Sequence, residues 1–198
     1  ATFMESDRIH ARAIIVSDYS TNYSHWNAKE SLAEWLQREK VPGITGIDTR
    51  QLTKVLREHG VMMGKIIFDD EEDNVIPDAQ YEGVNFVAEV SCKEVMHYAP
   101  TNGDANAPKV VLVDCGVKHN IIRCLIKRGV EVIRVPWDYN FNELEFDGLF
   151  LANGPGDPDT CVKTVEHIRA FLANPKVRPC MGICMGNQLL SKAAGATI

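Results

Sequence analysis

The stretch Gly182-Ile183-Cys184-Met185-Gly186-Asn187-Gln188 decides the fold, because it joins an apolar run to the helix-like segment LLSKAAGA. A glycine on each side of Cys184 lets a strand turn sharply into a helix, so that the thiol stands clear at the bend. A helix N-terminus stabilises a thiolate, and the N–H of Met185 would point to where an oxyanion forms. The pattern predicts a nucleophile elbow; a small buried cysteine at a strand end is the alternative interpretation.

A second Gly-rich turn, NGPGDP, runs from Asn153 to Pro158 and follows a predicted buried strand at residues 148–152. In an open parallel sheet the carboxyl ends of the strands form the edge that binds ligands, so we expect this turn to lie beside Cys184. Gly154 and Gly156 would let backbone N–H groups approach a substrate closely, unless the motif is a plain turn. Its spacing does not fit a dinucleotide-binding GxGxxG motif, and no P-loop lysine follows.

Apolar strands and helices alternate after residue 109. KVVLVDCG is a strand that ends in glycine, IIRCLIKRG is a helix and VEVIRVPW is the next strand. The strand before NGPGDP, a helix at 162–172, a strand at 177–183 and the helix after Cys184 continue the pattern. The fold class is therefore α/β, with a mostly parallel open sheet covered on both faces.

The composition predicts three parts: a small N-terminal α/β domain at residues 1–93, a linker at 94–109 and the parallel-sheet domain at 110–198. Pro, Asn, Asp and Gly cluster in the linker. In the small domain, Asn27 or Ser31 can cap one helix, and Asp48 begins a second that Gly60 ends. The acidic run at 69–73 is expected to be a solvated loop tip.

Composition also limits the function. The chain has 198 residues and a net charge of -6 without a basic cluster, which argues against a nucleic-acid partner. It has no long apolar run and no signal peptide, so no membrane partner is expected. The six cysteines lack metal spacing and scaffold density, which predicts reduced thiols, a cytoplasmic location and no metal site. The three tryptophans, at 26, 35 and 137, are expected to pack inside.

NGPGDP and GICMGNQ, in this order, resemble the class I glutamine amidotransferases, which use a Cys-His-Glu triad and have a flavodoxin-like fold. SDYSTNYSHW, IDTRQLTKVLREHGVMMGKI and DCGVKHNIIRCLIKRGVEVIRVPWD resemble the small, glutamine-hydrolysing chain of carbamoyl-phosphate synthetase. The resemblance covers most of the chain. It implies that L-glutamine is the substrate, that hydrolysis passes through a cysteine thioester, and that ammonia is channelled to a large synthetase subunit or domain.

The resemblance also implies roles for single residues. Cys184 would be the nucleophile, Gly154 and Met185 would bind the oxyanion, and Gly156 and Gln188 would hold the substrate. Asn187 departs from the family, because many relatives carry histidine there.

No histidine is assigned as the general base. The family's histidine, with a glutamate two residues further on, lies downstream of the elbow, and the sequence given ends at Ile198. We expect His119 and His167 to be solvated or packed, and we expect the sequence given to lack the family's N-terminal part as well.

The resemblance places ATP and Mg on the partner synthetase and no cofactor on this chain. It leaves open a separate subunit, as in a heterodimer, or a fused polypeptide, and arginine or pyrimidine synthesis as the pathway. Three other functions remain open. They are a catalytically incomplete structural or allosteric domain, a cysteine peptidase of related architecture, and a flavodoxin-like binding module.

Overall fold

The computed structural model describes residues 3–67 and 81–198, and these form two compact units. The smaller unit spans Asp7–Tyr81, and the larger combines Ala1–Ser6 with Glu82–Ile198. The sequence predicts a domain boundary in a linker at residues 94–109. Part of that stretch is a strand of the larger unit, β3 (Met96–Tyr98). The boundary between the compact units, after Tyr81, therefore lies earlier in the chain than the predicted linker.

The smaller unit has two short parallel strands, β1 (Ile14–Ile15) and β2 (Gly43–Ile44), and two helices, α1 (Leu32–Glu39) and α2 (Thr49–His59). Ser31 caps α1 in a capping box with Glu34, which settles the choice between Asn27 and Ser31. Asp48 caps α2 and Gly60 ends it at φ 79°, as predicted. A pocket of about 340 Å³ lies between α1 and the two strands.

Two sequence expectations for this part of the chain have different outcomes. Trp26 was expected to pack inside, but its side chain is 81% exposed and stacks on His25, so that prediction was wrong. The acidic run at 69–73 lies outside the described residues.

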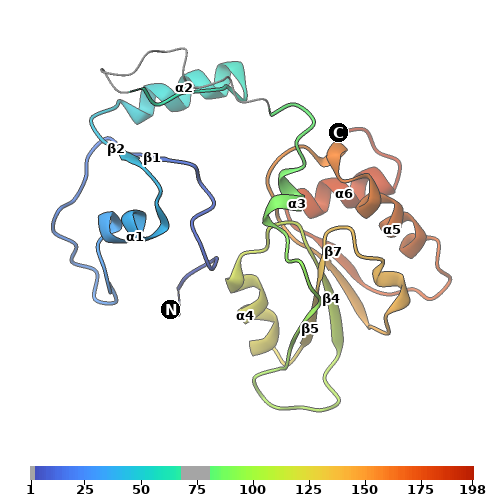
Figure 1. Ribbon diagram of the computed structural model, residues 1–198. Coiled ribbons are helices and arrows are strands. Elements are labelled where there is room, and N and C mark those ends of the chain that lie inside the picture. The colour runs from blue at the N-terminus through green and yellow to red at the C-terminus, as the bar shows by residue number, and fades with distance from the viewer. Residues whose placement is uncertain (1–2, 68–80) are drawn as a thin grey trace. The chain divides into compact units, whose positions relative to one another are not determined.

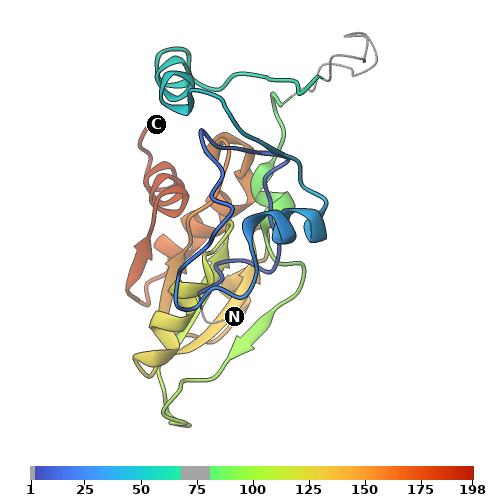
Figure 2. The same cartoon turned by 90° about the vertical axis from the view of Figure 1, so that its left-hand side faces the viewer.

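The larger unit is a five-stranded sheet in the order β3-β5-β4-β6-β7. Its parallel strands are β4 (Lys109–Asp114), β5 (Glu131–Pro136), β6 (Gly148–Leu151) and β7 (Cys180–Gly182). β3 adds to β5 in the antiparallel sense, and Figure 2 shows β3 and β7 at opposite edges. The mostly parallel α/β sheet predicted from the sequence is confirmed.

Helices cover both faces of this sheet, as Figure 1 shows for α4 (His119–Lys127) on one side and α5 (Val162–Leu172) and α6 (Met185–Ala193) on the other. The strands divide their side chains accordingly. Leu112 of β4 packs with Ile122 of α4, whereas Val111 and Val113 belong to the core that includes Met185 and residues of α5. Two 3₁₀ turns, η1 (Phe141–Glu143) and η2 (Pro158–Thr160), lie in the connections.

The start of the chain and a short helix also belong to the larger unit. Glu5 caps α4, because its carbonyl accepts the N–H of His119 at 3.1 Å and its carboxylate accepts that of Asn120 at 2.9 Å. The helix α3 (Phe86–Val90) buries Val87 completely, in the core that also contains residues of β4 and α6. No helix within residues 3–67 and 81–198 is long and apolar enough to cross a membrane.

Candidate active site

Cys184 follows Ile183 in the two-residue connection between β7 and α6, and it is the N-cap residue of the helix. Its backbone has φ 52° and ψ -114°, a conformation with positive φ that residues other than glycine rarely adopt. The side chain is exposed, whereas the next two residues, Met185 and Gly186, are buried. The strand therefore turns into the helix within two residues, and the thiol is presented to solvent, as the predicted nucleophile elbow requires.

The two glycines of the elbow are needed because backbones approach very closely there. A Cβ at Gly182 would lie 2.6 Å from the carbonyl of Gly186, and a Cβ at Gly186 would lie 2.1 Å from the carbonyl oxygen of Leu151. Real Cβ atoms essentially never come within 3.0 Å of another heavy atom in this way. The GxCxG spacing thus follows from the packing of α6 directly against β6 and β7.

The elbow and the NGPGDP turn are joined through the ends of β6 and β7. The N–H of Ile183 donates to Leu151 at 3.0 Å, and the N–H of Gly186 donates to the carbonyl of Ala152 at 3.0 Å. Ala152 immediately precedes the turn that holds Gly154. Both predicted turns therefore lie at the carboxyl edge of the sheet, where β4 and β6 adjoin although the chain passes through β5 between them. Such a switch in strand order is where open α/β sheets bind ligands.

The Gly154 turn rests on the loop that follows β4. A Cβ at Gly154 would lie 2.1 Å from the carbonyl oxygen of Cys115, so the two backbones touch. Asn153 donates from Nδ2 to the carbonyl of Gly116 at 3.0 Å, and Gly156, at φ 81°, faces the ring of Phe86 in α3. The turn that we expect to offer an oxyanion donor is therefore held from two sides by backbone and ring contacts.

Gln188 and Asn187 lie on the first turn of α6. Their N–H groups donate to the carbonyl of Cys184 at 3.1 and 3.0 Å, respectively. The side chain of Asn187 is exposed and that of Gln188 is half-buried. Met185 is the first residue of the helix, where the helical ladder offers no acceptor to its N–H. The roles assigned to these residues and to Gly154 and Gly156 stay predictions.

Cys184 differs in its environment from the four cysteines that are buried or half-buried. Burial raises the pKa of Cys92 and of Cys180 to about 11, with the charge of Asp114 adding to the effect at Cys92. Burial also raises the pKa of Cys115 and of Cys161. A raised pKa lowers the thiolate fraction at neutral pH, so these four thiols are poor nucleophiles. Cys184 and Cys124 are the exposed cysteines, and Cys184 is the one at the sheet's carboxyl edge.

The histidines near this sheet have other contacts. The Nε2 atom of His167 lies 3.3 Å from the carbonyl of Asp138, and its ring packs edge-on against Phe141. The Nδ1 atom of His97 on β3 lies 3.8 Å from the carboxylate of Glu131. Within the described residues, no group of three or more His, Cys, Asp or Glu side chains is arranged to hold a metal ion.

A buried ion pair beside the site was not foreseen from the sequence. Asp114, the last residue of β4, is fully buried, and its Oδ2 atom accepts from the Nε and NH2 atoms of Arg134 at 2.9 and 2.6 Å. Burial lowers the pKa of Arg134, but the Asp114 charge, helped by hydrogen bonds to Tyr98 and Asp114, raises it more, so the net shift is upward. A single Asp at the end of an apolar strand gives no sequence signal for such a pair.

Two family models match the chain. Residues 111–198 match "Glutamine amidotransferase class-I", and residues 1–66 match "Carbamoyl-phosphate synthase small chain, CPSase domain". The segment between them contains α3 and β3.

Curated relatives match the chain almost from end to end. It is 47% identical to the "Carbamoyl phosphate synthase arginine-specific small chain" of Saccharomyces cerevisiae, over 98% of this chain and 48% of the relative. It is 46% identical to "Carbamoyl-phosphate synthase [ammonia], mitochondrial" of Homo sapiens, over 98% of this chain and 12% of the relative. It is also 46% identical to "Multifunctional protein pyr1-3" of Dictyostelium discoideum, over 99% of this chain and 9% of the relative. The chain thus spans half or less of the length of these relatives. Both family models are matched in order, so the chain is similar to the carbamoyl-phosphate synthase small chain, with the class-I glutamine amidotransferase match at residues 111–198.

Proposed function

We propose that this chain provides the glutamine-hydrolysing site of a carbamoyl-phosphate synthase. The observation that carries the proposal is the exposed Cys184, held at φ 52° at the head of α6 and joined through Ala152 to the Gly154 turn. A strained, exposed residue at a strand–helix junction is typical of a functional site, because packing alone would favour glycine there.

The reaction begins when the Cys184 sulfur attacks the side-chain amide carbon of L-glutamine. The new S–C bond turns the carbonyl oxygen into an oxyanion, which accepts the N–H groups of Gly154 and Met185. The C–N bond then breaks, and ammonia leaves after its nitrogen has taken up a proton, which gives a glutamyl thioester. Water attacks the thioester carbon, the S–C bond breaks, and glutamate and the free thiol remain.

Binding of the substrate is assigned to Gly156 and Gln188. Gly156 has φ 81°, a backbone conformation that residues with a side chain rarely adopt, and Gln188 lies on the first turn of α6. A general base has to accept the thiol proton and return a proton to the leaving nitrogen. The family resemblance gives this part to a histidine–glutamate pair, and no histidine of this chain is assigned to it.

The ammonia would pass to a large synthetase subunit or domain that makes carbamoyl phosphate. We place ATP and Mg on that partner and no cofactor on this chain. The relatives' names include an arginine-specific chain and a mitochondrial protein, so the pathway stays open, and the cytoplasmic location stays a prediction from the cysteines.

The test is the glutaminase activity of the intact protein, measured as glutamate released, with and without Cys184→Ser. We expect the variant to lose activity by about 10³-fold or more, because a hydroxyl is a far weaker nucleophile than a thiolate. Cys124→Ser, at the other exposed cysteine, is the matched control and should leave the rate unchanged. Normal activity in Cys184→Ser would remove Cys184 from the mechanism.

A second candidate is an amidotransferase-like domain that takes no glutamine. The name of the human relative contains the word ammonia, and its 46% identity to this chain is about the same as that of the yeast and Dictyostelium relatives. The presence of a cysteine at the elbow favours hydrolysis instead. Intact protein that makes carbamoyl phosphate from ammonia but releases no glutamate from glutamine would support this second candidate.

A further inference from the structure

Besides its ion pair with Arg134, the carboxylate of Asp114 accepts hydrogen bonds from three backbone N–H groups. Its Oδ1 atom accepts the N–H groups of Gly116 and Val117 at 2.9 and 2.8 Å. Its Oδ2 atom accepts the N–H of Cys92 at 2.7 Å in addition to the two bonds from Arg134. A buried carboxylate with this many donors fixes the backbone around it, because the buried N–H of Val117 and the half-buried N–H groups of Gly116 and Cys92 would otherwise lose their acceptor.

The backbone that Asp114 fixes is the loop on which the Gly154 turn rests. The carbonyl oxygen of Cys115 touches the Cα of Gly154 so closely that a Cβ there would be 2.1 Å away. Gly116 has φ 122°, and a Cβ on it would lie 3.4 Å from the Cα of Gly154. The carbonyl of Gly116 also accepts the side chain of Asn153, the residue before Gly154. The contacts therefore run from Asp114 through the loop at 115–117 to Gly154 without a gap.

From this geometry we propose that Asp114 is a positioning residue for the oxyanion donor. Its carboxylate holds the loop at 115–117, and that loop sets where the N–H of Gly154 points. The proposal rests on the proposed glutaminase function. Arg134 has the supporting part, because it neutralises the buried charge and fixes which carboxylate oxygen faces the loop.

The first variant is Asp114→Asn in the intact protein. The positive charge of Arg134 will keep the amide oxygen on its own side, so the amide NH₂ faces the N–H groups of Gly116 and Val117. The two backbone N–H groups then face another hydrogen-bond donor and have no acceptor. The loop at 115–117 is therefore no longer held in place. Removing one oxyanion donor outright lowers kcat by about 10²–10³-fold, so a displaced donor should lower it by about 10- to 100-fold. KM for glutamine should change little, because the oxyanion forms only after binding.

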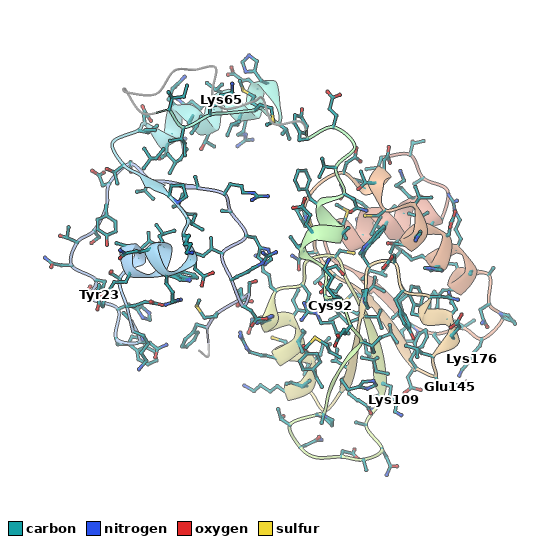
Figure 3. The ribbon with its side chains drawn as sticks, in the orientation of Figure 1. Tyr23, Lys65, Cys92, Lys109, Glu145 and Lys176 are labelled. Atoms are coloured by element: carbon teal, nitrogen blue, oxygen red, sulfur yellow. The ribbon has the colours of Figure 1, made fainter. Side chains whose placement is uncertain are left out.

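Asp147→Asn is the matched control. Asp147 also accepts a backbone N–H through its carboxylate, that of Lys109 at 2.8 Å, but at the opposite end of β4. In Figure 3 Lys109 is labelled at the lower end of the larger unit, away from Cys92. This variant should keep the normal kcat.

Alkylation of Cys184 by iodoacetamide separates positioning from general damage. The sulfur displaces iodide at a saturated carbon, an S–C bond replaces the C–I bond, and no oxyanion forms. Asp114→Asn should therefore be alkylated at Cys184 at the normal rate, followed by mass spectrometry of the peptide, while glutamine turnover falls. A merely structural role would slow or speed both reactions together.

A second variant keeps the test open if Asp114→Asn does not fold. Asn153→Ala leaves the buried ion pair intact and removes the bond between Asn153 and Gly116, so kcat should fall by about 10-fold with normal alkylation. Normal kcat in folded Asp114→Asn, or in Asn153→Ala if the first variant is unfolded, overturns the proposal. If the unaltered protein releases no glutamate, the proposed function itself has failed, which is a different result.

Discussion

Replacing Gly154 with alanine should remove most of the glutamine turnover while the protein stays folded. The added Cβ would lie 2.1 Å from the carbonyl oxygen of Cys115 and 2.9 Å from its carbonyl carbon and Cβ, and all three positions are fixed by the neighbouring loop. The contact has to lengthen from 2.1 Å to at least 3.0 Å, so one of the two backbones must move by about 0.9 Å.

The size of the effect follows from that displacement. A misplacement of about 1 Å at a reacting centre costs about 10²-fold in rate, and the loss should appear in kcat. Overpacking of this kind destabilises by about 1–3 kcal/mol, which a small domain tolerates. The measurements are steady-state release of glutamate and thermal unfolding of the same preparation.

Gly148→Ala is the control for this prediction, because it makes the same substitution at the start of β6, the strand that precedes the Gly154 turn. A Cβ at Gly148 would meet its nearest neighbour, on Val110, at an ordinary 3.5 Å. We expect a kcat within about twofold of normal, since neither backbone has to move. The reasoning would be refuted by normal turnover in Gly154→Ala, or by an equal loss in both variants.

The exposed thiols should be alkylated at pH 8 well before the buried ones, and mass spectrometry of the labelled peptides resolves them. For Cys92 and Cys180, whose pKa burial raises to about 11, labelling of the folded protein should still increase from pH 9 to pH 11, because the thiolate forms only there; a plateau by pH 9 would contradict the shift. In the smaller unit, Ser31→Ala should lower the free energy of unfolding by about 1 kcal/mol, because the N–H of Glu34 in the first turn of α1 loses its acceptor. Ser20→Ala, which removes a hydroxyl bonded only within an exposed loop, should leave the unfolding curve unchanged in the same denaturation experiment.

The sheet of the larger unit could be predicted because its signals are local and strong. The strand ending at Asp114 is continuously apolar, and the helix predicted at 162–172 has the bounds of α5. Glycine also predicted the ends of two helices correctly, at Gly60 and Gly129, and both residues have a positive φ. In each case one short window of sequence contains the whole physical cause.

The elements that the sequence did not predict are short and depend on distant partners. β3 has three residues and exists because it pairs with β5, and α3 has five residues and is anchored by the burial of Val87. Such elements have too few residues for a hydrophobic period to show. The role of Glu5 as the cap of α4 was equally invisible, because cap and helix are more than a hundred residues apart.

The candidate site shows the same division. The two turns that hold Cys184, Gly154 and Gly156 could be predicted because sharp turns need glycine in a fixed spacing, whereas the roles of these residues stay predictions. Asp114 and Arg134 were missed, since they come from separate strands and meet only when β4 and β5 pair. Asn153 was seen only as part of a turn, although its side chain bonds to the loop after β4.

At position 184, stability of the fold and the proposed catalysis favour different residues. A positive φ in a residue with a Cβ costs of order 1–3 kcal/mol, and glycine would relieve it. Folding by itself therefore disfavours the cysteine. In any descendant that no longer needed hydrolysis, mutation and drift would tend to replace it and make the protein sturdier, so that its retention in a sequence is a sign of selection for chemistry.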